Sequence, residues 1–187
     1  MKLIVLGARF GQACAAAIVL GLSSTVIKWQ KYPPLPAETG FGAFVGGYGL
    51  VAAAIGLVAA VTHFIPDKMM LIVDGLAVAC FAISGITLSI RIRGMNCAED
   101  FIAMHYKDRG HAFALFDGGY DNEYKKYGCT VYSDDDSTCD PAAFVRKCHT
   151  ITADAASIWI AFLACILAAG LAWRSRTRGS VSRTSTA

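Results

Sequence analysis

Residues 41–65 read FGAFVGGYGLVAAAIGLVAAVTHFI, a run that contains no Asp, Glu, Lys or Arg. A helix needs about 20 mostly apolar residues to cross a hydrocarbon core of about 30 Å. Three further runs reach that length, at residues 3–27, 69–90 and 151–173. The chain of 187 residues is 55% hydrophobic and only 17% charged, so a soluble bundle would lack the polar surface to cover four such helices. We therefore predict an all-α fold, a transmembrane four-helix bundle that occupies residues 1–173.

A cleaved signal peptide is the alternative interpretation of the first apolar run. Lys2 offers a positively charged start, and residues 15–17 are three alanines that could precede a cleavage site. The apolar run that follows Arg9 is, however, longer than the apolar region of a signal peptide. This length favours a membrane-spanning helix.

Small residues recur at helical spacing within the second run. Gly42 and Gly46 form a G-x-x-x-G step, and the pattern continues through Gly49, Ala53 and Gly56. Small side chains allow helix backbones to approach closely inside a bilayer, where the hydrophobic effect does not drive helices together. Packing against a neighbouring helix of the same chain is the favoured interpretation, and a dimerisation face is the alternative.

Three charged residues lie inside the apolar runs, and a charge within a bilayer needs a partner or a function. Arg9 and Asp74 are expected at similar depths, so we predict that they form a structural ion pair. The alternative is that Asp74 belongs to an ion or proton path. Asp154 is expected near the opposite membrane face, where Arg91 or Arg93 could reach it.

A long loop, residues 91–150, separates the third and fourth runs and is aromatic enough to fold as a small cap. It holds four cysteines, which are Cys97, Cys129, Cys139 and Cys148. An even number in one loop predicts two disulfides and an oxidising compartment. A zinc site that uses His149 is the alternative, but no Cys-x-x-Cys pair supports it. Lys and Arg are almost evenly divided between the two faces, so the cysteines alone place the loop outside and both termini in the cytoplasm.

The last segment, residues 174–187, is rich in Arg, Ser and Thr. We expect it to be a disordered, basic cytoplasmic tail. Its first arginines are Arg174, Arg176 and Arg178, and each attracts anionic lipid by about 1 kcal/mol when it lies near a membrane surface. Phosphorylation of the Ser and Thr residues would weaken this attraction.

No set of residues in the chain resembles a catalytic or cofactor site. No His is placed with a Ser or Cys nucleophile in a recognisable pattern, and no glycine loop of the phosphate-binding type is present. The acidic run at residues 134–136 lacks the alternating ligands and central Gly of an EF-hand. We therefore expect no enzymatic activity, no metal, no nucleic-acid partner and no cofactor other than a structural lipid or sterol.

Three stretches support a family resemblance. They are Arg9–Ile27, then Val73-Asp74-Gly75-Leu76 through to Asn96-Cys97, and finally Cys148 followed by Ala153-Asp154-Ala155-Ala156. With the long loop between the last two helices, the chain resembles the MARVEL domain, in particular the small fungal MARVEL proteins of the non-classical-export type. The loop is longer than in those proteins, and Cys129 and Cys139 look like additions. The Cys-Cys-Gly motif of tetraspanins is absent.

The resemblance has consequences for the cysteines and for function. It implies that Cys97 pairs with Cys148 across the ends of the loop, which leaves Cys129 and Cys139 to close an inner hairpin. It also implies a plasma-membrane location and a part in membrane microdomains. The leading hypothesis is a non-enzymatic membrane organiser that associates with lipids, with itself or with a larger membrane complex. An accessory subunit of a membrane enzyme or transporter and a small transporter using Asp74 are the alternatives.

Overall fold

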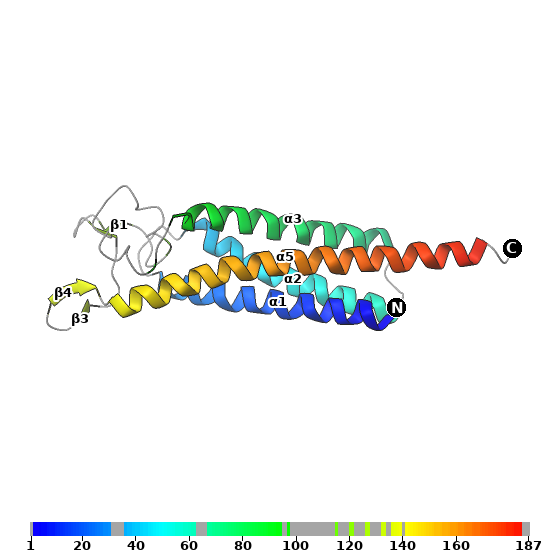
Figure 1. Cartoon of the computed structure of the whole chain (residues 1–187), viewed down its shortest axis with the longest axis horizontal. Coiled ribbons are helices and arrows are strands. Elements are labelled where there is room, and N and C mark those ends of the chain that lie inside the picture. Colours follow the sequence, from blue (N-terminus) through cyan, green and yellow to red (C-terminus); the bar gives the residue numbers. More distant parts are fainter. Residues whose placement is uncertain are drawn as a thin grey trace.

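A computed structural model of the chain consists of four long helices side by side, joined at one end to short strands (Figure 1). It describes residues 2–30, 36–62, 67–94, 97, 115, 120–121, 126–127, 132–133, 136–139 and 141–184. The helices are α1 (Lys2–Trp29), α2 (Ala37–Thr62), α3 (Asp67–Ile92) and α5 (Pro141–Thr184). The predicted all-α four-helix bundle is therefore confirmed.

The strands form two small antiparallel hairpins at the loop end of the bundle. β1 (Tyr120–Asp121) pairs with β2 (Lys126–Tyr127), and β3 (Tyr132–Ser133) pairs with β4 (Asp136–Cys139). Most of the loop, including the acidic residues 134 and 135, lies outside the described residues. Among the described residues, no three His, Cys, Asp or Glu side chains are close enough to hold a metal ion.

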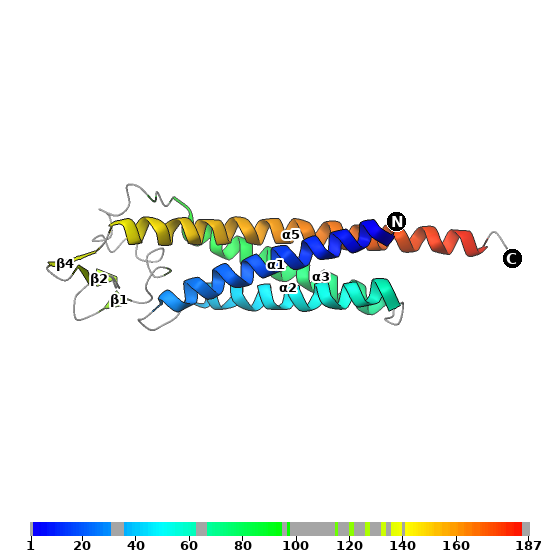
Figure 2. The same cartoon turned by 90° about the horizontal axis from the view of Figure 1, so that it is seen from below.

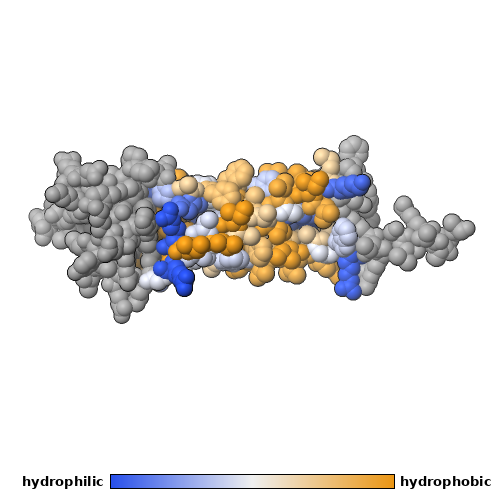
Figure 3. All heavy atoms as spheres, turned by 90° about the horizontal axis from the view of Figure 1, so that it is seen from above, coloured by the Kyte–Doolittle hydropathy of each residue, from blue (hydrophilic) through white to orange (hydrophobic). Residues whose placement is uncertain are grey.

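Each helix is long and apolar enough to cross a bilayer, which makes the chain a multi-pass membrane protein. The candidate spans are Leu3–Trp29, Ala37–Thr62, Lys68–Ile92 and Val145–Arg174. The surface of the bundle carries large exposed apolar side chains along these spans, such as Phe10, Phe44, Ile72, Ile160 and Leu167. Figure 3 shows this apolar band with hydrophilic residues at both of its ends, the pattern expected of a surface that faces lipid.

The helices pack in a ring around a core of small and branched side chains. α1 lies against both α2 and α5, and α3 lies against both α5 and α2 (Figures 1 and 2). The core includes Ala16, Val19, Val45, Phe81 and Ile158, all fully buried. Because α1 supplies part of this core, it is a structural element of the bundle.

The fourth helix differs from the prediction at both of its ends. It begins at Pro141 rather than near residue 151, and it continues to Thr184 where a disordered tail was expected. Proline is well suited to the first turn of a helix because its missing N–H is not needed there. Cys148 and Ile151 are buried in the bundle, so packing stabilises the added turns. The arginines after residue 173 favour helix, and no proline follows residue 141 to end α5.

Candidate functional site

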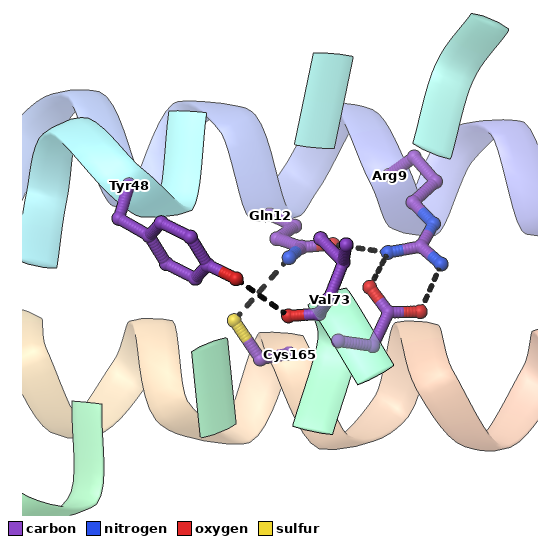
Figure 4. Close-up of polar contacts among 6 residues, drawn as sticks. Arg9, Gln12, Tyr48, Val73 and Cys165 are labelled. Carbon is purple, nitrogen blue, oxygen red and sulfur yellow. Dashed lines mark hydrogen bonds and ion pairs between the residues drawn. The ribbon is translucent and has the colours of Figure 1, made fainter. Parts of the chain in front are cut away.

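The most distinctive feature of the bundle is a buried polar centre at the end that contains the start of α1. Arg9 is only 2% exposed, although it is the largest of the fully buried side chains that the structure describes. Its Nη1 donates to Asp74 Oδ1 at 2.6 Å and its Nη2 donates to Asp74 Oδ2 at 2.5 Å (Figure 4). The two residues come from α1 and α3, so the structure brings together the pair that the sequence suggested. The bidentate geometry leaves neither carboxylate oxygen without a donor.

Gln12 extends this centre to the fourth helix. It lies one turn after Arg9 on the same face of α1, and its Oε1 accepts a hydrogen bond from Arg9 Nη1 at 3.0 Å. Its Nε2 donates to Cys165 Sγ on α5 at 3.4 Å (Figure 4). The sequence reasoning missed Gln12, although a polar residue three positions after a buried arginine was an available signal.

The second helix, α2, contributes a glycine to this centre rather than a charged side chain. A Cβ placed on Gly56 would lie 2.6 Å from Arg9 Nε and 2.8 Å from Arg9 Cζ. A glycine is therefore needed at this point of α2 if the guanidinium is to lie against the helix backbone. Nearby on α2, the Tyr48 hydroxyl donates to the backbone oxygen of Val73 at 3.3 Å, next to Asp74 on α3 (Figure 4).

The other small residues of α2 that the sequence pattern singled out, Gly42, Gly46, Gly49 and Ala53, are also buried inside the chain's own bundle. A Cβ on Gly42 would lie 2.8 Å from Ser23 Oγ, and a Cβ on Gly49 would lie 2.7 Å from Phe81 Cζ. A Cβ on Gly46 would lie 2.7 Å from the backbone nitrogen of Leu20. With Ala53, which is fully buried, these glycines fill the face of α2 that packs on neighbouring helices of the same chain.

A second buried polar group lies toward the loop end. Asp154 on α5 accepts a hydrogen bond from Ser23 Oγ on α1 at 2.9 Å, through Oδ2. The expectation that Arg91 reaches Asp154 is wrong, because Arg91 Nε donates instead to Glu38 Oε1 on α2 at 2.7 Å. Arg93 is exposed and follows the end of α3.

Four contacts between successive helices close the loop end of the bundle into a ring. Gln30, the residue directly after α1, donates through Nε2 to Thr39 Oγ1 on α2 at 3.1 Å. α2 meets α3 through the Glu38–Arg91 ion pair, with Arg91 Nη2 at 2.5 Å from Glu38 Oε1. The ring continues from α3 to α5 and from α5 back to α1, through the Cys97–Cys148 disulfide and through Lys147 Nζ, which lies 5.8 Å from the centre of the Trp29 ring.

The remaining predicted residues lie at the two ends of the molecule. Cys97 and Cys148 are joined, with their Cα atoms 5.7 Å apart, whereas Cys129 lies outside the described residues and Cys139 ends β4. The proposed second disulfide therefore stays a prediction. Arg174 is exposed at the end of the fourth span, and the side chains of Arg176 and Arg178 lie outside the described part of the chain.

Comparison with known proteins gives one result. The family model described as MARVEL, a membrane-associating domain, matches residues 2–171. This match includes α1, α2 and α3 and the part of α5 up to residue 171, and it confirms the family predicted from the sequence. No curated protein and no solved structure matches the chain.

Proposed function

The chain belongs to the MARVEL family, and from this premise we propose that it is a non-enzymatic membrane organiser. It acts in the plane of the bilayer by gathering lipids and membrane proteins around its four helices. We place it in the plasma membrane, where it assembles with further copies of itself or within a larger membrane complex.

The observation that supports this proposal most is the contrast between the interior and the surface of the bundle. Inside, the Arg9 and Asp74 side chains satisfy each other. Outside, the spans present large apolar side chains such as Phe10, Phe44 and Ile160. An apolar surface of this kind suits lateral contact with lipid chains and with other helices.

The same geometry gives less support to the transporter hypothesis. Both Asp74 oxygens are held by Arg9, so a passing ion would first have to break a buried ion pair. Fully buried apolar side chains, among them Val19, Phe81 and Ile158, also form the core of the bundle. We therefore assign Arg9 and Asp74 a structural role.

The orientation that we propose rests on the cysteines. A Cys97–Cys148 disulfide is stable in an oxidising compartment, which supports a loop outside the cell and both termini in the cytoplasm. In that orientation the end of α5, with Arg174 and the arginines that follow it, lies beside the anionic cytoplasmic leaflet. We propose that these arginines hold negatively charged lipids close to the protein.

Extraction of the full chain in native nanodiscs, followed by mass measurement of the intact particles, tests the proposal. A membrane organiser is expected as homo-oligomers, with sterol or sphingolipid enriched over the bulk membrane. A large protein partner at fixed stoichiometry would instead favour the accessory-subunit alternative. Loss of a proton flux in Asp74→Asn vesicles, with a normal fold, would contradict the organiser proposal and favour the transporter.

A further inference from the structure

Asp154 differs from the other buried acid of the bundle in having almost no partners. Its side chain is 2% exposed, and its Oδ2 accepts one hydrogen bond, from Ser23 Oγ. Its Oδ1 is buried and has no hydrogen-bond partner among the described residues. Asp74, by contrast, is bound through both oxygens by a guanidinium.

No described cationic side chain donates a hydrogen bond to Asp154. On α1 the charged residue nearest in sequence to Ser23 is Lys28, which is exposed. On α2 the charged residue nearest in sequence to Gly42 is Glu38, which is paired with Arg91 of α3. On α5 the nearest are Lys147, whose Nζ lies over the Trp29 ring, and His149, which is exposed. The other titratable or charged residues of the spans are Arg9, Cys14, Tyr48, Lys68, Asp74, Cys80, Arg146, Cys165 and Arg174.

On α2, the residue beside Ser23 is a glycine. A Cβ on Gly42 would lie 2.8 Å from Ser23 Oγ and 3.9 Å from Ser84 Oγ. At this point α1 and α3 therefore contribute serine hydroxyl groups, and α2 contributes a glycine without a side chain. A carboxylate that receives only one hydroxyl hydrogen bond inside a bilayer is costly. Because Oδ1 is buried, a lipid headgroup cannot reach it, whereas a proton needs no additional space.

We propose that Asp154 is a proton-binding site of the assembled bundle. The proton bonds to Oδ1 while α1 and α5 are packed together, which leaves a neutral carboxylic acid beside Ser23. When the contact between α1 and α5 opens, the proton passes to water and the carboxylate becomes hydrated. The loop-end half of the bundle is thus held together more firmly in acidic than in alkaline surroundings, independently of the proposed organising function.

The sign of this effect follows from which state binds the proton. The packed state binds it and the opened state releases it, so the stabilisation is complete at low pH and is lost as the pH rises. The fall takes place between the pH at which the opened state releases its proton and the higher pH at which the packed state does, and beyond that pH it stops. Within this range, each pH unit is expected to lower the melting temperature of a chain of this size by about 3–5 °C.

Thermal unfolding of the full chain in detergent micelles, followed by circular dichroism over a range of pH, tests the proposal. The wild-type melting temperature is expected to fall as the pH rises, and Asp154→Asn, a neutral side chain of the same shape, is expected to remove this fall. Asp74→Asn is the matched control, because it changes a buried acid of the same bundle but leaves Asp154, and hence the pH-dependent fall, in place.

An infrared measurement keeps the proposal testable if Asp154→Asn does not fold. Full chain labelled with ¹³C-aspartate is expected to show the carbonyl stretch of a protonated carboxylic acid, and Asp154→Glu is expected to lose this labelled band. Absence of the band from the wild type would overturn the proposal. A melting temperature that depends on sodium concentration but not on pH would overturn it as well, because the site would then bind a metal cation.

Discussion

At the scale of single residues, Arg9 and Asp74 neutralise each other's charge in the interior of the bundle. Arg9→Leu leaves the Asp74 carboxylate buried without its guanidinium, which is expected to lower the free energy of unfolding by about 3–5 kcal/mol. Adding Asp74→Leu removes the unpaired charge, so the double variant should recover most of that loss. Reversible unfolding in mixed detergent micelles measures all three proteins. Equal destabilisation of the single and double variants would contradict the structural role of the pair.

Gly56 permits a second prediction at the same scale. The added methyl of Gly56→Ala would lie 2.6 Å from Arg9 Nε, so the guanidinium has to shift away from α2. Overpacking of this kind costs about 1–3 kcal/mol. Gly75→Ala is the matched control, because a Cβ on Gly75 meets nothing within 4 Å and alanine favours helix. In an Arg9→Ala background the cost of Gly56→Ala should disappear; if it persists, Arg9 is not its cause.

At the scale of helices, adjacent glycines of α2 are expected to respond in opposite ways. A Cβ on Gly46 would lie 2.7 Å from the backbone nitrogen of Leu20 on α1, whereas a Cβ on Gly47 meets nothing within 4 Å. Gly46→Ala therefore has to push α1 away from α2, and we expect it to lower the unfolding temperature. Gly47→Ala is expected to leave that temperature unchanged or to raise it slightly, because alanine favours helix. Equal effects of both substitutions would mean that α1 and α2 are not in close contact at Gly46.

Helices were also the level at which the sequence was most informative. Hydropathy located all four spans, because about 20 consecutive apolar residues are needed to cross a bilayer. The ends of α5 were missed, since residues 141–150 look polar in sequence but bury Cys148 against the bundle. Tertiary contacts decide such a boundary, and they are not visible in local composition.

Some side-chain partners could likewise be predicted from the sequence, and others could not. Arg9 and Asp74 could be paired because opposite charges at similar depth have few other options within a bilayer. The partner of Asp154 was predicted incorrectly, because Glu38 on α2 competes for Arg91 and the serine at position 23 carried no signal of its own. Hydroxyl partners are difficult to predict, since serine is common on helix faces that pack closely.

At the scale of the whole molecule, the two ends of the bundle are stabilised by different chemistry. The end that contains the start of α1 depends on one buried ion pair, Arg9–Asp74. The loop end is closed by a ring of four contacts, of which the Cys97–Cys148 disulfide is the covalent one. The ring fixes the helices near the point where the chain leaves the bundle for its long loop. The loop is thereby attached to a closed end of the bundle.

Removal of this covalent contact tests how much the ring contributes. Cys97 and Cys148 are 51 residues apart in sequence, and a bridge that closes a loop of this length is expected to stabilise the fold by about 4 kcal/mol. The double variant Cys97→Ser with Cys148→Ser should unfold at a lower temperature than the oxidised wild type. Reduction of the wild type should give a shift at least as large, because it would also open the predicted Cys129–Cys139 disulfide. Cys14→Ser is the matched control, because this exposed thiol forms no disulfide. If peptide mapping of the wild type joined Cys97 to Cys129 instead, the ring would lack its covalent member and this prediction would fail.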